Sequence, residues 1–276
     1  MTLPTLYLAH GGGPWPWMHG PMRDYHDGLA RSLAGLPSHL PSQPVAVLLV
    51  TAHWEAPVFT MSAGAAPGML YDYSGFPPET YALRYTAPGA PALAQRAAEL
   101  LASVGIDAAL DTERGFDHGS FVPMFAMYPQ AGMPVLQMSL RRGLDPAQHI
   151  AAGRALAPLR AEGVLIVGSG SSYHNMQERG PSAFAPSQAF DGWLQRVLAG
   201  PNPAGREAAL LRWEEAPAAR HAHPREEHLL PLMVAAGAAA GETGRCIFRE
   251  ERFFGISTVS SFCFGEWQDC PPPAMR

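Results

Sequence analysis

Two short apolar runs constrain the fold of this chain more than any other sequence feature. Residues 45–50 read Val-Ala-Val-Leu-Leu-Val, and residues 164–167 read Val-Leu-Ile-Val. A strand with one face in water alternates apolar and polar residues, whereas a run without alternation is typical of a strand that helices cover on both faces. We therefore expect both runs to form central strands of a mainly parallel sheet.

Other segments with strand and helix signals alternate along the chain. We expect six strands, near residues 4–9, 45–52, 134–140, 164–168, 245–249 and 257–264. Helices are expected at 90–104, at 145–163 and at about 224–240, where Pro231 predicts a kink or a later start. Glycine and proline mark loops at 11–21, 64–78 and 179–187. This order predicts a three-layer α/β/α fold, with a mainly parallel central sheet flanked by helices and the active site at the C-terminal strand ends.

No repeat, linker or low-complexity segment divides the chain. Its 276 residues fall within the range of one large α/β domain. We therefore expect a single catalytic domain over residues 1–276, with a loosely ordered, proline-rich tail at 267–276. A monomer or a small homo-oligomer is expected.

The charged residues and cysteines limit the classes of partner and chemistry. The formal net charge is −5, so no basic field attracts nucleic acid. All 19 basic residues are arginine, which excludes a P-loop and Schiff-base chemistry on lysine. Cys246, Cys263 and Cys270 form no pair with metal-binding spacing, and their odd number favours a reducing cytoplasm. No signal peptide or membrane-spanning apolar run is apparent, so no membrane is expected.

Histidines follow the ends of the expected strands. His10 comes directly after the first strand, His53 after the second, and His174 just past the strand at 164–168. The C-terminal ends of parallel strands meet at one edge of the sheet, so these imidazoles should converge there. His118, in a glycine-flanked loop, and His228, before an apolar helix face, are further candidates. Neutral imidazoles favour a transition-metal ion, such as iron, zinc, copper or nickel, over magnesium or calcium.

A single histidine in a loop is more often hydrogen-bonded than a metal ligand. A metal site is therefore expected only because five such histidines are predicted to lie together. His221 and His223 are weaker alternatives to His228. The other four histidines are expected to be exposed to solvent: His19, His26, His39 and His149. Two histidines and one carboxylate form a common iron site, so three acidic residues are alternative ligands: Glu55, Glu226 and Glu227.

Glycine motifs suggest a rival class of enzyme. His10 is followed by three glycines, which matches the oxyanion-hole motif of some lipases and esterases. However, no Gly-x-Ser-x-Gly elbow accompanies it, because residues 168–172 read Gly-Ser-Gly-Ser-Ser, with serine and glycine in the wrong phase. That string could form a backbone anion site, but the signal is weak. We favour a simpler role, in which glycine lets the backbone pass close to a metal and substrate.

With these motifs located, the chain resembles the extradiol ring-cleavage dioxygenases of the 4,5-DOPA dioxygenase type, within the class III extradiol superfamily. The resemblance runs almost end to end and depends on five blocks in the same order. These are Ala-His-Gly-Gly at 9–12, Thr-Ala-His-Trp at 51–54, Asp-His-Gly at 117–119, Gly-Ser-Gly at 168–170 with His174 and Asn175, and His-Pro-Arg-Glu-Glu-His-Leu-Leu-Pro-Leu at 223–232.

The resemblance implies roles for five histidines. His10, His53 and His228 would hold one divalent metal ion, with iron(II) expected for activity and zinc(II) able to occupy the isolated protein. Many class III enzymes use a glutamate where this chain has His228. His174 corresponds to the acid/base histidine and, without substrate, to a fourth ligand, and His118 to a pocket histidine that handles oxygen or protons.

The implied reaction opens the ring of a catechol-type, DOPA-like substrate, so a small aromatic diol and O2 are the expected partners. Imidazole, with an ordinary pKa of about 6.5, suits the task of taking a proton from the catechol and returning it. Aromatic side chains that could surround the ring, although each is more often ordinary packing, are Trp15, Phe76, Phe121 and Tyr173. A noncatalytic Memo-like protein that binds a metal or a partner is the main alternative, and a serine esterase a lesser one.

Overall fold

The strands of the computed structural model, which describes residues 1–178 and 180–268, form one sheet of eight strands. They are β1 (Thr5–Ala9), β2 (Ala46–Ala56), β3 (Phe59–Ser62), β4 (Ala108–Asp111), β5 (Val135–Arg141), β6 (Val164–Gly170), β7 (Gly244–Phe253) and β8 (Ser257–Phe264). Their order across the sheet is β4-β3-β5-β2-β6-β1-β8-β7.

The middle of the sheet is parallel. β5, β2, β6 and β1 pair with one another in parallel, whereas β3 is antiparallel to β5, and β8 is antiparallel to both β1 and β7. The two uninterrupted apolar runs lie in β2 and β6, the central pair, and are buried except for Val45, which precedes β2. The predicted mainly parallel sheet and its two central strands are therefore confirmed.

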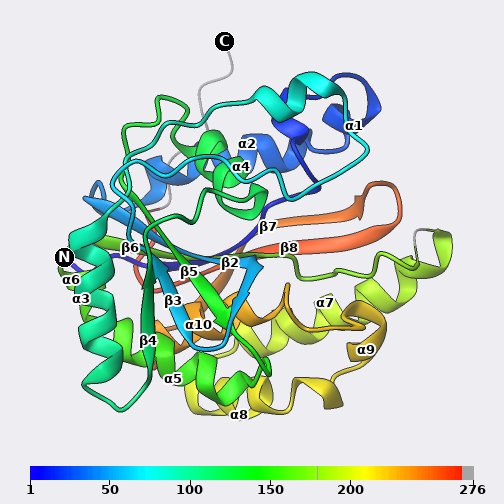
Figure 1. Cartoon of the computed structure of the whole chain (residues 1–276). Coiled ribbons are helices and arrows are strands. Elements are labelled where there is room, and N and C mark those ends of the chain that lie inside the picture. The colour runs from blue at the N-terminus through cyan, green and yellow to red at the C-terminus, as the bar shows by residue number, and fades with distance from the viewer. Residues whose placement is uncertain (179, 269–276) are drawn as a thin grey trace.

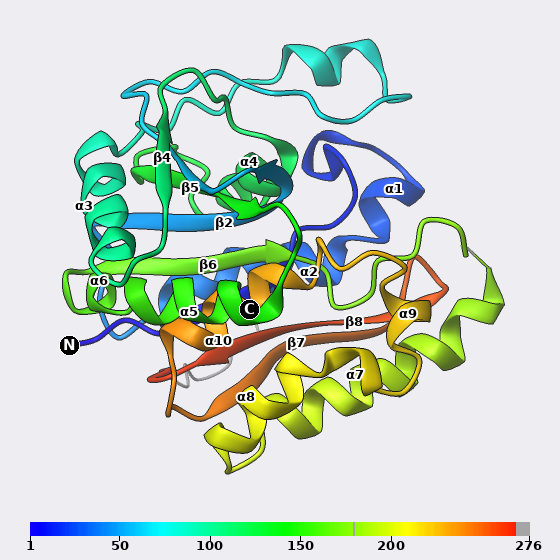
Figure 2. The ribbon, with the colours of Figure 1, turned by 60° about the horizontal axis from the view of Figure 1, so that its bottom comes forward.

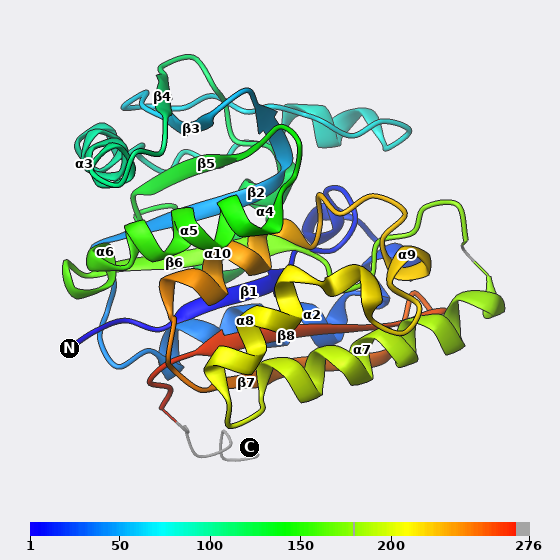
Figure 3. The same ribbon diagram turned by 90° about the horizontal axis from the view of Figure 1, so that it is seen from below.

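Helices cover both faces of this sheet. They are α1 (Pro21–Asp24), α2 (Asp27–Gly35), α3 (Pro91–Ala102), α4 (His118–Met127), α5 (Pro146–Leu156), α6 (Pro158–Ala161), α7 (Phe184–Leu198), α8 (Pro203–Leu211), α9 (Ala219–Ala222) and α10 (Leu230–Ala238). In Figure 1, α2 and α4 lie above the sheet, and α5, α7, α8 and α10 lie below it. Figure 3 shows this second layer from below, with α5 and α10 packed side by side. The three-layer α/β/α arrangement agrees with the sequence prediction.

Two of the eight strands and several helices were not predicted. β3 and β4 have only four residues each and lie on one edge of the sheet, where β propensity is a weak guide. The expected loop at 179–187 was partly wrong, because a 3₁₀ turn at Pro181–Ala183 leads into α7. Residue 179 lies outside the described residues.

Prolines explain why two helices have other bounds than those predicted. The helix expected at 145–163 starts as predicted, with the Asp145 carboxylate accepting a hydrogen bond from the Ala147 N–H at 2.8 Å, but it divides into α5 and α6 before Pro158. The helix expected from 224 begins only at Leu230, with Pro231 in its first turn, which is the later start that Pro231 indicated.

The described part of the chain ends with two residues, 267 and 268, of the tail expected at 267–276, and both contact His39. The Trp267 ring stacks on His39 at a centroid distance of 4.9 Å, and the Gln268 N–H donates to the His39 carbonyl. The rest of the expected tail, 269–276, lies outside the described residues. Within residues 1–178 and 180–268, no helix is long and apolar enough to cross a membrane.

The parallel strands set the position of the site. β2 and β6 pair in parallel, and Figure 2 shows both running toward the side of the molecule where the segment that enters α10 reaches the sheet. β2 runs three residues beyond His53, so this histidine lies within the strand rather than after it. It lies where the register of β2 with β5 shifts, between Val50 and Glu55, before pairing resumes at Glu55 and Ala56, so His53 stands in an irregular part of the strand.

Candidate metal centre

Three imidazoles from three parts of the chain converge at this edge of the sheet. His10 follows β1, His53 lies in β2 and His228 precedes α10. Their ring centroids are separated by 5.0 Å (His10 to His53), 5.2 Å (His10 to His228) and 4.9 Å (His53 to His228). The structure thus brings together the three histidines that the sequence nominated as ligands.

The two other nominated histidines flank this triad. His118, the first residue of α4, lies with its ring centroid 4.0 Å from that of His53. The ring of His174 stacks on that of His228, with centroids 3.4 Å apart and an interplanar angle of 14°. All five imidazoles therefore belong to one cluster.

A serine fixes the orientation of the His10 ring. The Ser169 hydroxyl donates its only hydrogen to the Gly119 carbonyl, so its oxygen must accept from His10 Nδ1–H, 3.1 Å away. The hydrogen of neutral His10 therefore lies on Nδ1, and the Nε2 lone pair remains free. Ser169 is fully buried and its hydrogen is committed, so it has no access to a substrate as a nucleophile.

Carboxylates perform the same task for the other two members of the triad. His53 Nδ1 lies 3.2 Å from an Asp72 oxygen, and His228 Nδ1 lies 3.0 Å from a Glu227 oxygen. A carboxylate only accepts hydrogen bonds, so both rings carry hydrogen on Nδ1 and direct an Nε2 lone pair elsewhere. Metal-binding histidines in proteins are commonly held in this manner.

The triad fits a divalent metal ion. His10 Nε2 and His53 Nε2 lie 3.2 Å apart, and ligand atoms of all three histidines lie within 4.8 Å of one another. Nitrogens bound at about 2.0–2.1 Å in a tetrahedral site are roughly 3.3 Å apart. The spacing between the first pair is therefore that of two ligands to one ion.

Burial keeps the triad in the form that binds metal. Desolvation, together with the neighbouring histidines, holds the pKa values of His10 and His228 well below the ordinary value. Desolvation also lowers the pKa of His53 to about 3, with His118 adding to the effect and Asp72 opposing it. Neutral imidazole is the ligand form, so these three side chains need not lose a proton at neutral pH.

Two further groups contain enough ligand atoms for a metal, but hydrogen bonds account for both. They are His53 with Asp72 and His118, and His174 with Glu227 and His228. In each group one imidazole, His118 or His228, donates Nδ1–H to the carboxylate, and Nδ1 of the other lies 3.2 Å from a carboxylate oxygen. Burial raises the pKa values of Asp72 and Glu227, but bonds from the histidines outweigh it and hold both pKa values below the ordinary range, so both groups are ionised acceptors.

The other acidic residues considered as ligands are paired with arginines. Glu55 forms a two-bond ion pair with Arg225, at 2.6 and 2.7 Å. Glu226 pairs with Arg220 at 2.7 Å. Glu55 and Glu226 therefore lie outside the candidate metal groups of the described chain.

Small residues on β6 allow His228 to approach the sheet. A Cβ atom at Gly168 would collide with the Pro231 carbonyl, and one at Gly170 with the His228 carbonyl. The same His228 carbonyl accepts hydrogen bonds from the Tyr7 hydroxyl at 2.8 Å and from the Ser171 N–H at 3.1 Å. The Gly-Ser-Gly string of the sequence is thus a place of close backbone packing that positions a histidine.

The glycines after His10 form a turn held by aromatic side chains. Gly11 and Gly13 have positive φ angles of 78° and 56°, which glycine adopts without strain. The indole N–H of Trp15 donates to the His10 carbonyl at 2.8 Å, and His26 Nε2 accepts from the Gly12 N–H at 3.2 Å. Trp15 is therefore a buried support of His10, the ordinary packing role that the sequence also allowed.

The expectation that the remaining histidines are exposed was wrong for His26 and His149. Both are fully buried, because each ring has a backbone donor for Nε2 and a backbone carbonyl for Nδ1–H. His39 is half-buried beneath Trp267, and His19 is exposed as expected. His221, the weaker alternative ligand, is exposed and lies outside the candidate metal groups of the described residues. His223 is buried against the Ser172 carbonyl and supports the loop rather than the triad.

Neither Asp72 nor the role of Ser169 was predicted from the sequence. Asp72 lies in the expected loop at 64–78, and no local pattern distinguishes it from other acidic loop residues. Ser169 stood in a string whose spacing suggested an anion site. The only sequence signal for it was its place beside the glycines at the end of a predicted strand.

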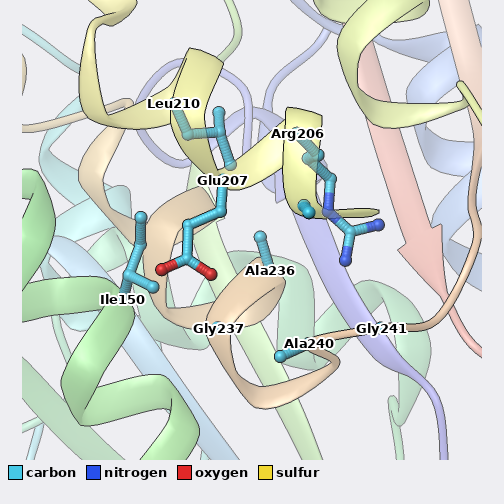
Figure 4. Close-up of a pocket in the computed structure, with 9 residues that line it drawn as sticks. Ile150, Arg206, Glu207, Leu210, Ala236, Gly237, Ala240 and Gly241 are labelled. Carbon is cyan, nitrogen blue, oxygen red and sulfur yellow. The ribbon is translucent and has the colours of Figure 1, made fainter. Parts of the chain in front are cut away.

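A separate cavity of about 330 Å³ lies between α5, α8 and α10, away from the histidines. Figure 4 shows its walls, which are mostly aliphatic and small, with two charged side chains, Arg206 and Glu207, that come from α8. Arg206 donates to the carbonyls of Ala239 and Glu242, and Glu207 pairs with Arg154 at 2.7 Å. Both charges are therefore engaged within the protein, and the cavity gathers no reactive groups.

The fold and the histidine cluster define a three-layer α/β protein with a candidate metal-binding site at the strand ends. Residues 3–261 match the family described as the catalytic LigB subunit of aromatic ring-opening dioxygenase. The chain belongs to this family and is an aromatic ring-opening dioxygenase, as the sequence predicted.

Known proteins similar to the chain agree with this assignment. It is 45% identical to a 4,5-DOPA dioxygenase extradiol of Portulaca grandiflora, over 72% of this chain and 74% of the relative. It is 36% identical to the protein of the same name from Escherichia coli K12, over 87% and 86%. A crystal structure of an uncharacterised Escherichia coli K12 protein matches with a TM-score of 0.77 and 32% identity, over 95% of this chain and 100% of that one.

Proposed function

We propose that residues 1–276 act as one catalytic unit that opens a catechol ring in the extradiol position with O2. The observation that carries this proposal is the cluster of five imidazoles, in which three free Nε2 atoms can hold an ion and two further rings lie beside them. Relatives named 4,5-DOPA dioxygenase extradiol support a DOPA-like catechol as the substrate class.

His10, His53 and His228 would hold the metal, which we propose to be iron(II). When bound, iron(II) supplies open coordination positions for the catechol oxygens and O2, and the redox activity that this reaction requires. Three neutral ligands add no negative charge to the site, so zinc(II) would also fit after isolation. Iron(II) is preferred because zinc has no redox chemistry.

His174 would serve as the acid/base residue. Its Nδ1–H is held by Glu227 at 3.2 Å, which leaves Nε2 as the atom that exchanges a proton. Its side chain is 26% exposed, whereas that of His228 beneath it is 5% exposed, so His174 is on the open side of the cluster. We propose that His174 Nε2 takes a proton from a catechol hydroxyl and returns it when the ring opens.

His118 would hydrogen-bond oxygen from the opposite side. Its Nδ1–H is committed to Asp72 at 2.9 Å, so Nε2 is again the free atom. Aromatic side chains gather beside it: the Tyr73 ring lies 6.0 Å from His118 and 5.4 Å from Phe76. Phe76 also packs against Gly13 of the turn after His10. We propose that the substrate ring enters along this aromatic wall.

A turnover assay with defined metal content tests the proposal. Protein loaded anaerobically with iron(II) and then exposed to O2 and a panel of catechols should form yellow ring-opened products. Loss of this activity with a chelator is expected, and ester hydrolysis that survives the chelator would support the serine-esterase alternative instead. No product across the panel, with iron verified in the site, would contradict the proposal and favour a noncatalytic Memo-like role.

His174→Ala separates its two suggested roles. As an acid/base residue, His174 should affect turnover by roughly 10²- to 10⁴-fold while metal content stays near that of the wild type. An equal loss of metal and turnover would make it a principal ligand. His221→Ala, which changes an exposed histidine outside the cluster, is the matched control.

A further inference from the structure

Two carboxylates, Asp72 and Glu227, make equivalent contacts with the histidine cluster. Each contacts one histidine of the triad and one of the two flanking histidines. Asp72 contacts His53 at 3.2 Å and His118 at 2.9 Å. Glu227 contacts His228 at 3.0 Å and His174 at 3.2 Å. In all four contacts the imidazole atom is Nδ1.

We propose that Asp72 and Glu227 are positioning residues that lock each proton-handling histidine to the neighbouring metal ligand, so that metal binding and proton transfer share the same supports. The inference rests on the proposed function for the roles of His118 and His174. The role of the two carboxylates would be to orient both the metal ligands and the histidines that exchange protons.

At Glu227 a single carboxylate oxygen contacts both imidazoles. One oxygen, Oε1, accepts from Nδ1 of both His228 and His174, whose stacked rings are nearly parallel. The two rings therefore present their Nε2 atoms on the side away from Glu227. Its other oxygen lies 3.5 Å from Arg225, which is itself held by Glu55. A movement of Glu227 would disturb both imidazoles together.

Asp72 makes the same connection from a distant loop. One oxygen accepts from both the backbone N–H and Nδ1–H of His118, and the other faces His53. The Asp72 side chain is 16% exposed, although its backbone is open to solvent. The loop is thus attached to the cluster through this carboxylate, and the side chain contributes little to the apolar core.

Amide substitutions test the proposal because they keep the shape and remove the charge. Glu227→Gln leaves a single, weaker acceptor oxygen for two imidazoles, and Asp72→Asn leaves one for two imidazoles and the His118 backbone N–H. Zn²⁺ affinity, measured by competition with a chromophoric chelator, should fall about 10- to 100-fold in each variant. With iron saturating, kcat should fall about 10-fold or more and KM should change little, because neither carboxylate contacts substrate.

Matched controls change nearby carboxylates that do not contact the histidines. Glu226→Gln alters the neighbour of Glu227, which pairs with Arg220. Glu79→Gln alters an exposed residue that follows the Asp72 loop. Both should keep the wild-type Zn²⁺ affinity and kcat. If Glu227→Gln failed to fold, Asp72→Asn would still test the same arrangement, since its loop backbone is exposed.

Double variants distinguish this role from general destabilisation. In a His174→Ala background, Glu227→Gln should reduce kcat by less than roughly twofold, because the ring through which it acts is gone, while the loss of Zn²⁺ affinity through His228 should persist. Asp72→Asn should behave likewise in a His118→Ala background. Equal kcat losses in both backgrounds, or unchanged Zn²⁺ affinity in the single variants, would overturn the inference.

The two measurements also separate this inference from the proposed function. If the wild-type protein opened no catechol, the proposed function would be contradicted. The Zn²⁺ affinities would nevertheless show whether the carboxylates support the ligands. Normal affinities in Asp72→Asn and Glu227→Gln would then overturn the inference on their own.

Discussion

His10 Nε2 and His53 Nε2 face each other at 3.2 Å, and Nδ1 of each ring lies beside an acceptor that favours hydrogen on that atom, Ser169 for His10 and Asp72 for His53. Two lone pairs at this distance repel unless a cation lies between them. Metal binding should therefore stabilise the fold, by about 2.7 kcal/mol when the free metal is at 100 times its Kd. Thermal unfolding with and without Zn²⁺ or Fe²⁺ measures this effect.

Removal of one member of the pair gives the control. His10→Ala should lose most of the metal-induced rise in Tm, whereas His221→Ala, outside the cluster, should keep it. A rise that is unchanged in His10→Ala would place the ion elsewhere.

Ser169→Ala should weaken metal binding without touching a ligand. The change leaves His10 Nδ1–H without its acceptor and frees the ring to turn, so we expect Zn²⁺ affinity to fall about 10- to 100-fold. Two buried groups, His10 Nδ1–H and the Gly119 carbonyl, also lose a partner, which costs about 1–3 kcal/mol of folding free energy. Chelator competition and urea unfolding measure the two effects.

Ser187→Ala is the matched control for this change. Ser187 is also buried and also bridges two backbone groups, the Thr258 N–H and the Phe184 carbonyl, but it lies in α7. It should lower stability and leave Zn²⁺ affinity unaltered. If both serine variants lowered Zn²⁺ affinity equally, lower stability rather than a freed His10 ring would be the cause.

Gly170→Ala should displace His228. The added Cβ would collide with the His228 carbonyl, so the segment must move, at a cost of about 1–3 kcal/mol. Zn²⁺ affinity should fall with stability. Gly132→Ala, where no atom lies within 4 Å of the added Cβ, should change stability by less than about 0.5 kcal/mol and leave metal binding intact. Normal metal binding in Gly170→Ala would show that the approach of His228 is not required.

The triad could be predicted from sequence because its position follows from strand order. His10 and His53 occur at the ends of apolar runs, and parallel strands end at one edge of a sheet. His228 was harder to place, since the glycines of β6 that admit its backbone act through packing. The pattern identified the glycines but not the segment that they contact.

The supports of the cluster could not be predicted, because they depend on how loops cross the sheet. Asp72 is 46 residues from His118 in the chain, and Ser169 is 159 residues from His10. The same reason explains the errors at His26 and His149. A histidine beside a helix or loop appears exposed in sequence, and only the folded chain shows backbone groups that satisfy both of its ring nitrogens.

His149 should make stability depend on pH. Burial lowers its pKa to about 4, against weaker opposing effects from Asp145. The ring accepts from the Arg141 N–H and donates to the Asp145 carbonyl, so protonation of Nε2 would break the first bond. Below pH 6.5 the unfolded chain takes up a proton that the folded chain resists, so stability is full above pH 6.5 and is lost as the pH falls from 6.5 toward 4.

Comparison with His149→Gln isolates this contribution, because the other titrating histidines are common to both proteins. The unfolding free energy of the wild type minus that of the variant, from urea titrations, should decrease by about 2 kcal/mol between pH 7.5 and pH 5. The decrease should be small between pH 8.5 and 7.5, where the histidine is neutral in both states. A difference that stays constant from pH 7.5 to 5 would mean that His149 takes up its proton as readily in the folded protein as in the unfolded chain.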